Sequence, residues 1–260
     1  MSVSITGLMC HAPIVLPPIG GDRAGECTTT TRGMREVASR IVGARPDVVV
    51  VVSPHTPRAL DEWTVYDGAR IRASFEDFGA PGERIDLPAA VDARIKLRRE
   101  PIPTQLRSEG PLDYGATVPL WFLQKAGWTG PTLVVGLPWE EGSEEAMGVA
   151  IRSASAGARW AVVASGDMSH RLQKGSPSGF HPRATEFDAA VVDHLKRGDL
   201  QGLAELDRAL RSLAAEDVVA PVTVAAAATD WKSDRRQIFG YEGPFGVGYC
   251  TAVLHAEGSR

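Results

Sequence analysis

Cysteines, long apolar runs and surplus basic residues are all scarce in this sequence of 260 residues. The three cysteines, Cys10, Cys27 and Cys250, are too few and too scattered for a disulfide framework or a paired-cysteine metal site. No apolar run approaches the roughly 18 residues of a membrane span, and the N-terminus lacks the basic start of a signal peptide. We therefore expect a cytoplasmic protein without membrane contact.

The net charge and the absence of several catalytic motifs exclude further classes of partner and reaction. A formal net charge of -4 gives no general attraction for nucleic acid or anionic lipid, so neither is an expected partner. The sequence has no GxSxG elbow, no phosphate-binding loop of the GxxxxGKS/T type and no HExxH pair. Serine hydrolysis through Ser53 and His55 is a disfavoured alternative. A small molecule is the expected partner.

Apolar runs followed by turn residues predict the fold. Four such runs are SITGLMC, DVVVVV, PTLVVGL and ARWAVVA, and the segment TTTTRGMREVASRIVGARPD between the first two has helical spacing behind a threonine-rich start. This pattern predicts an α/β fold with a mostly parallel or mixed central sheet flanked by helices. The segment RQIFGYEGPFGVGYCTAVLHA predicts a C-terminal β-hairpin at the sheet edge. We expect one domain over residues 1–260.

Three of the six histidines follow predicted strands. His11, His55 and His170 come after the first, second and fourth of these runs, where open α/β sheets collect their ligands. Pro54 and Pro57 frame His55 and restrict the backbone around it, which suits a preorganised ligand. A single loop histidine bonded to a backbone carbonyl is the ordinary alternative, but three at equivalent strand ends favour a functional site.

The other histidines have weaker functional signals. His194 lies on the apolar stripe of a predicted helix, and His255 lies in the last strand, so structural roles are expected for both. His181 precedes a predicted helix, and it either lines the cleft and binds substrate or is a simple loop residue.

Two histidines and a carboxylate form the facial triad that holds non-haem Fe(II). Glu216 and Asp217 stand at the start of an alanine- and valine-rich predicted helix, where acids also complement the helix dipole. Glu242 stands at the predicted hairpin turn, where a solvated residue is the ordinary interpretation. Spacing alone does not choose among these three acids.

The segments CHAPIVLPPIGG, VVSPHTPR, LDYGATVPLWFL, SGDMSH and YEGPFGVGY, in this order, resemble the class III extradiol ring-cleavage dioxygenases, the family of the catalytic LigB subunit. The related Memo-like proteins share the fold. The resemblance implies Fe(II) held by two histidines and one glutamate, with His11 and His55 as ligands and His170 as the catalytic acid/base. For the carboxylate it favours Glu216, closely followed by Asp217, with Glu242 third.

One motif departs from the resemblance. Many members carry Asp-His-Gly where this chain has Asp113-Tyr114-Gly115. As a catalytic-site residue, Tyr114 donates a hydrogen bond to substrate or bound oxygen, but a phenol that titrates near 10 does not replace imidazole as a base at neutral pH.

The implied reaction is cleavage of a catechol-type or aminophenol-type aromatic ring by dioxygen at Fe(II), with Zn as a possible substitute in purified protein. His170 would carry protons, which an imidazole does well near neutral pH. Two alternatives stay open: a Memo-like non-catalytic metal-binding or regulatory protein, and a zinc-bound lyase or hydrolase that uses the same histidines. A homo-oligomer or a small second subunit is a possible assembly.

Overall fold

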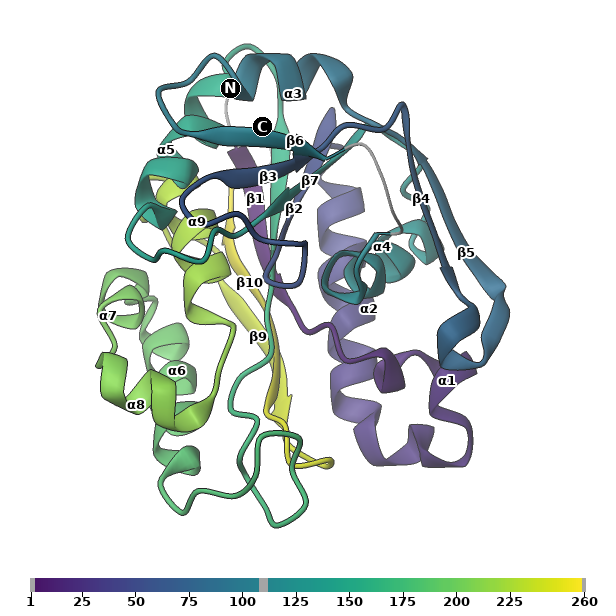
Figure 1. Ribbon diagram of the computed structural model, residues 1–260, viewed down its shortest axis with the longest axis vertical. Helices are drawn as coiled ribbons and strands as arrows, with labels where there is room; N and C mark the ends of the chain where they lie inside the picture. The colour runs from purple at the N-terminus through teal and green to yellow at the C-terminus, as the bar shows by residue number, and fades with distance from the viewer. Residues whose placement is uncertain (1–2, 108–111, 259–260) are drawn as a thin grey trace.

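The computed structural model describes residues 3–107 and 112–258, and an eight-stranded sheet forms the centre of this part of the chain (Figure 1). The strand order is β6-β3-β7-β2-β8-β1-β10-β9, and β4 pairs with β5 in a separate two-stranded sheet. The strands are β1 (Val3–Met9), β2 (Val48–Ser53), β3 (Trp63–Tyr66), β4 (Arg70–Phe75), β5 (Ala80–Pro88), β6 (Thr104–Arg107), β7 (Thr132–Gly136), β8 (Trp160–Ser165), β9 (Gln237–Glu242) and β10 (Tyr249–Ala256).

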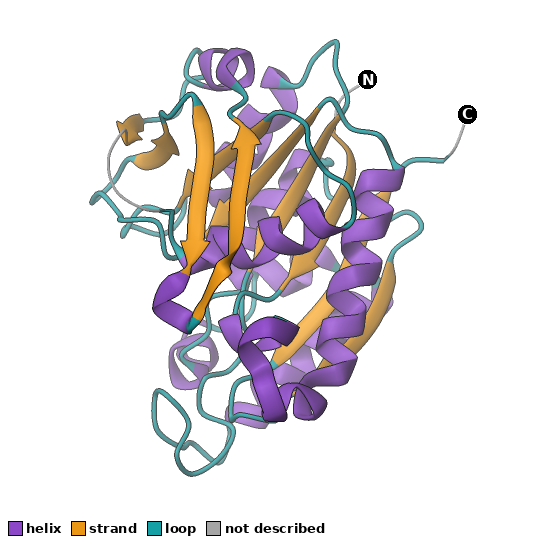
Figure 2. Ribbon diagram, turned by 90° about the vertical axis from the view of Figure 1, so that its right-hand side faces the viewer, coloured by secondary structure: helices purple, strands orange, loops and turns teal. Residues whose placement is uncertain are grey.

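Helices cover both faces of the central sheet. They are α1 (Pro17–Gly20), α2 (Thr28–Gly43), α3 (Val91–Leu97), α4 (Tyr114–Lys125), α5 (Glu144–Ala154), α6 (Ala184–Arg197), α7 (Leu200–Ala204), α8 (Arg208–Ala214) and α9 (Val219–Ala228). One core lies between the sheet and α3, α5, α6, α7 and α9, and the other between the sheet and α2, α4 and the β4–β5 pair. Figure 2 shows this second layer in front of the sheet. Within residues 3–107 and 112–258, no helix combines the length and the apolar character needed to cross a membrane.

The predicted α/β architecture is confirmed. The valines of β2 explain why the run is so apolar: Val48, Val50 and Val52 enter one core, while Val49 and Val51 enter the other. A strand buried on both faces needs apolar residues at successive positions rather than at alternate ones. The C-terminal hairpin is also confirmed, because β9 and β10 pair antiparallel and β9 forms one edge of the sheet.

The start of α2 differs from the sequence expectation. No threonine side chain caps this helix; its N-cap is Cys27, which makes no side-chain capping bond. The carboxylate of Glu242, at the end of β9, instead accepts hydrogen bonds of 2.6 Å from both the backbone amide and the hydroxyl of Thr30. Glu242 is therefore not a solvated turn residue, because it satisfies an amide of the first turn of α2.

Four neighbouring strands set the position of the functional loops. β1 and β8, β8 and β2, and β2 and β7 all pair in parallel, with Met9 beside Ser165 and Ser53 beside Gly136. The carboxyl ends of these four strands therefore lie side by side at the same end of the sheet. The loops that follow them, which contain His11, His55 and His170, leave the sheet on the same side, as ligand-binding loops of open α/β sheets do.

Candidate metal centre

His11 and His55 meet at the carboxyl ends of β1 and β2. Their Nε2 atoms are 3.0 Å apart and their rings lie edge to face, with centroids 4.7 Å apart. His11 is 1% exposed, whereas the side chain of His55 is 30% exposed. One histidine therefore lies at the floor of the site and the other at its opening.

Asp217 completes a group of three. Its Oδ2 atom is 3.4 Å from Nε2 of His11 and 3.3 Å from Nε2 of His55. Its Oδ1 atom accepts a 2.7 Å hydrogen bond from the backbone amide of Asp167, which fixes the carboxylate against the loop after β8. One donor atom from each of the three residues lies within 4.8 Å of the other two.

The separations within this group fit a metal ion. Metal–ligand bonds of about 2.1 Å place neighbouring donors about 3.0 Å apart at right angles and about 3.4 Å apart at tetrahedral angles. The three observed separations, 3.0, 3.3 and 3.4 Å, lie in this interval. Two imidazoles and one carboxylate are also the donor set of the facial triad, so the geometry and the chemistry suit iron or zinc.

Charges within the group shift the pKa values of its histidine and carboxylate side chains. Burial alone would lower the pKa of His11, but the nearby carboxylates of Asp167 and Asp217 raise it to about 9. Burial alone would likewise raise the pKa of Asp217, but the charge of His11 and hydrogen bonds from His11 and His55 lower it. Asp217 is thus ionised at neutral pH, and the group attracts a cation.

Glu216, the acid that the resemblance favours as the carboxylate ligand, lies apart from the three-residue group. Glu216 turns away from the histidines: it accepts a 2.7 Å hydrogen bond from Nε of Arg211, and it accepts the backbone amides of Val218 and Val219 at 2.7 and 2.8 Å. Its side chain is 2% exposed. Glu216 therefore satisfies the amides at the start of α9, and Glu242 performs a similar task for α2, so Asp217 is the acid that faces both histidines.

His170 lies in the loop after β8 and is partly buried. Its Nδ1 atom is 3.1 Å from the carbonyl oxygen of Met168. Because a carbonyl only accepts, Nδ1 carries a proton and Nε2 is the basic atom of the neutral ring. Burial raises the pKa of Asp167, and a positive charge on His170 would oppose this rise and help to lower the pKa of Asp217, so His170 lies within electrostatic reach of the group.

Tyr114, the first residue of α4, stands over His55. Its hydroxyl is 3.3 Å from Nδ1 of His55, and the two ring centroids are 4.3 Å apart. Burial and the neighbouring carboxylates, Asp217 first, raise the pKa of Tyr114, so the phenol stays protonated at neutral pH. Tyr114 is therefore close to the group, with its hydroxyl on the far side of the His55 ring from Nε2.

The remaining predicted histidines have local contacts. His181 lies in the turn before α6, where its ring accepts the backbone amide of Arg183 at 3.2 Å. His194 pairs with Asp199 at 2.9 Å, and His255 is buried in β10, as expected for structural residues.

Two further acids, Asp113 and Asp167, contact the histidine loops, and neither was predicted from the sequence to belong to the site. Asp113 accepts hydrogen bonds from Ser53 and Thr56, on either side of His55, at 2.5 and 2.7 Å. Asp167 is 3% exposed and accepts the backbone amide of His11 at 3.0 Å. An acid two residues after the buried strand β8 was the available signal for Asp167.

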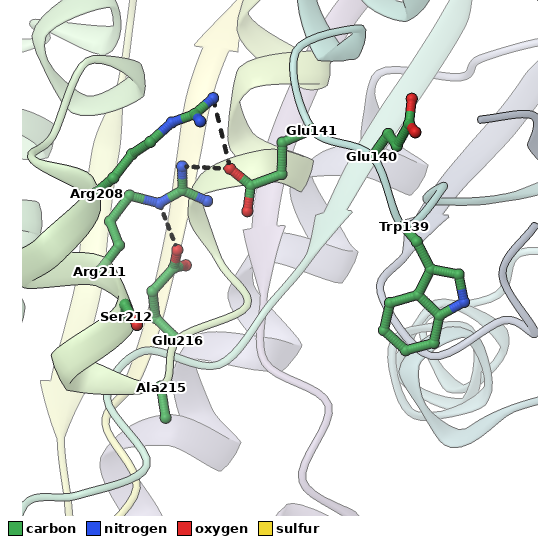
Figure 3. A pocket seen from close by; sticks show the side chains of 8 residues that line it. All are labelled: Trp139, Glu140, Glu141, Arg208, Arg211, Ser212, Ala215 and Glu216. Carbon is green, nitrogen blue, oxygen red and sulfur yellow. Dashed lines mark hydrogen bonds and ion pairs between the residues drawn. The ribbon is translucent and has the colours of Figure 1, made fainter. Parts of the chain in front are cut away.

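A cavity of about 750 Å³ borders the loop that carries Asp217 (Figure 3). Figure 3 shows Glu216 and Glu141 held by arginines on one side and the exposed Trp139 on the other. The guanidinium of Arg58, from the loop that carries His55, lies 4.9 Å from the ring centre of Trp139, which lines this cavity. The lining residues are Trp139, Glu140, Glu141, Arg208, Arg211, Ser212, Ala215 and Glu216.

Comparisons with known proteins agree with this architecture. A protein of Clostridium acetobutylicum, Protein CA_C1420, is 28% identical over 274 aligned positions, which cover 98% of this chain and 58% of that protein. The chain thus spans little more than half the length of this relative. The crystal structure of the uncharacterized protein JW3007 from Escherichia coli K12 aligns with a TM-score of 0.65 at 20% identity, covering 97% of this chain and 100% of that one, and so shares the fold.

The family comparison is more specific. Residues 6–252 match the family described as the catalytic LigB subunit of aromatic ring-opening dioxygenase. The match extends from β1 into β10, and it includes His11, His55, His170 and Asp217. The chain therefore belongs to the family of the catalytic LigB subunit of aromatic ring-opening dioxygenases.

Proposed function

We propose that this protein is an Fe(II)-dependent extradiol dioxygenase that cleaves a catechol-type or aminophenol-type aromatic ring with dioxygen. The observation that carries the proposal is the group of His11, His55 and Asp217, whose donor atoms are 3.0 to 3.4 Å apart. Family membership supports a dioxygenase activity, and the donor set supports a metal with further open coordination positions.

His11, His55 and Asp217 would hold the iron. When bound, Fe(II) supplies coordination positions for the two substituents of the substrate and for dioxygen, and it passes electron density between them. The burial of His11 excludes water from one side of the group, while the partial exposure of His55 leaves the other side accessible. Both oxygen atoms end in the ring-opened product, so the reaction needs no external reductant.

His170 is the proposed acid/base. The carbonyl of Met168 holds the proton on Nδ1, so Nε2 is free to take a proton from a substrate hydroxyl and to return it later in the reaction. Tyr114 stays protonated and supplies no base. The proton therefore moves through one imidazole in both directions.

The test is metal loading followed by a substrate screen. Protein purified without oxygen and loaded with Fe(II) should consume dioxygen with at least one member of a panel of catechol, protocatechuate, gallate and aminophenols. His55→Ala should lose both iron and turnover, whereas His170→Ala should keep iron and lose turnover. His194→Ala, which removes a histidine of α6 that is bonded to Asp199, is the matched control and should change neither.

Two outcomes would contradict the proposal. Ring cleavage by an iron-free His55→Ala protein would remove the metal centre from the reaction. Tight metal binding by the wild-type protein without oxygen uptake on the whole panel would favour the alternative, a Memo-like metal-binding or regulatory protein.

A further inference from the structure

The turn Asp113-Tyr114-Gly115, at the start of α4, contacts the surroundings of both candidate histidine ligands. Each of its three residues makes a different contact: Asp113 through its carboxylate, Tyr114 through its hydroxyl and Gly115 through its backbone carbonyl. These contacts cross between segments far apart in the sequence, because α4 packs against both β2 and β8.

Asp113 holds the loop of His55 from both sides. Its Oδ1 atom accepts the hydroxyl of Ser53 at 2.5 Å, and its Oδ2 atom accepts the hydroxyl of Thr56 at 2.7 Å. Ser53 in turn accepts the backbone amide of His55 at 3.2 Å. Oδ1 also accepts the backbone amide of Ala116, so one carboxylate both caps α4 and fixes the residues that flank His55.

Gly115 sets the proton position on His11 through Ser165. The hydroxyl of Ser165 donates to the carbonyl oxygen of Gly115 at 2.5 Å, so its proton is already used. The hydroxyl oxygen of Ser165 also lies 3.1 Å from Nδ1 of His11. Because its own proton is already used, this oxygen must accept a hydrogen bond from Nδ1. The neutral His11 ring thus carries its proton on Nδ1 and presents the lone pair of Nε2 to Asp217 and His55.

Tyr114 offers the equivalent partner to His55. When Nε2 of His55 is a ligand, Nδ1 must carry the proton, and the Tyr114 oxygen 3.3 Å away accepts it. The close approach of the turn requires glycine at position 115: a Cβ atom there would lie 2.4 Å from the Ser53 hydroxyl and 3.2 Å from Cδ2 of His55. The turn therefore fits against the histidines only with this small residue.

We propose that the Asp113-Tyr114-Gly115 turn is the outer support of the metal centre and presents Nε2 of both His11 and His55 to the metal. The inference rests on the metal centre of the proposed function but not on ring cleavage. Asp113 and Ser165 are positioning residues in this arrangement, since neither belongs to the three-residue group. Outer partners of this kind typically change metal affinity 10- to 100-fold when they are removed.

The experiment measures Zn(II) affinity by competition with a chromophoric chelator. Asp113→Ser keeps a helix-capping oxygen for Ala116 but removes the second oxygen that holds Thr56, and Ser165→Ala removes the acceptor of the His11 proton. Both variants should bind Zn(II) about 10- to 100-fold more weakly than wild type. Asp207→Ser is the matched control, because Asp207 caps α8 through the amide of Leu210, and its affinity should stay within about twofold.

Two further measurements keep the inference testable if a variant folds poorly. Thr56→Val removes only the bond to Oδ2 of Asp113 and should weaken Zn(II) binding in the same direction. Nitrogen NMR of histidine-labelled, metal-free protein, titrated until His11 is neutral, should show the His11 proton on Nδ1 in wild type and a mixture of tautomers in Ser165→Ala.

Unchanged Zn(II) affinity in Asp113→Ser, Thr56→Val and Ser165→Ala would overturn the inference. A neutral wild-type His11 with its proton on Nε2 would also overturn it, whether or not metal binds. A protein that binds Zn(II) as expected but cleaves no aromatic ring would contradict the proposed function and leave these affinity comparisons valid.

Discussion

Replacement of Asp188 by asparagine should stabilise the protein at neutral pH. Asp188 lies on α6, is 1% exposed, and accepts hydrogen bonds from the Ser169 amide at 2.8 Å and the Tyr241 hydroxyl at 2.7 Å. Burial raises its pKa from the ordinary 3.8 to about 6, and the two hydrogen bonds only partly oppose this rise. The folded protein therefore holds an acid that prefers to be protonated and is ionised at pH 7.

The magnitude follows from proton linkage. Between pH 3.8 and about 6 the folded state binds more protons at Asp188 than the unfolded state, so the free energy of unfolding falls as the pH rises. The difference of about 2.2 pKa units, at about 1.4 kcal/mol for each, amounts to about 3 kcal/mol at pH 7. Asparagine has nearly the same shape, accepts from Ser169 and avoids the ionisation.

The assay is urea unfolding of wild type and Asp188→Asn, with chelator present, from about pH 3.5 to pH 7.5. The stability difference should be near zero at the acid end and rise to at most about 3 kcal/mol in favour of the variant. The control is Asp193→Asn on the same helix, because that side chain is 63% exposed and its pair with Arg197 is expected to contribute less than about 1 kcal/mol. A pH-independent difference, or a variant less stable than wild type at pH 7, would refute the reasoning.

Four more predictions concern the metal centre and the packing of α2. Glu216→Gln should lower the free energy of unfolding by about 1–3 kcal/mol through the lost pair with Arg211, yet keep its metal in elemental analysis. Asp217→Asn should instead lose most of its metal. Because the pKa of His11 is raised to about 9, metal binding below that pH should release a proton, and affinity should rise with pH up to about 9. Calorimetry in two buffers of different ionisation enthalpy measures this release, and equal heats would contradict it. Gly33→Ala should destabilise the protein by about 1–3 kcal/mol despite the better helix propensity of alanine, because its Cβ would lie 2.0 Å from the Thr251 hydroxyl. Thermal unfolding checks the loss, and Thr251→Ala should restore most of it.

The sequence predicted the strands that carry the site, and it did so for a local reason. The valine run of β2 and the apolar runs of β1, β7 and β8 have the composition of strands buried on both faces, which needs no knowledge of the rest of the chain. The strands β3, β4, β5 and β6 had no such signal. β4, for example, alternates exposed and buried residues over only six positions.

The sequence also placed His11, His55 and His170 at strand ends, and the parallel pairing of β1, β8 and β2 makes those ends neighbours. It left the choice of acid open. Glu216 and Asp217 are adjacent and chemically alike, so no pattern of spacing separates them.

Tertiary structure alone separates these two acids, because their neighbours come from distant segments. Arg211 of α8 and the first amides of α9 bind Glu216, whereas the amide of Asp167 after β8 directs Asp217 toward the histidines. The support of His55 by Asp113 depends in the same way on α4 packing beside β2. The apolar runs by themselves determined that β1, β2, β7 and β8 are strands buried on both faces. The direction of each polar side chain at the carboxyl ends of these strands depended on hydrogen-bond partners that only the folded chain supplies.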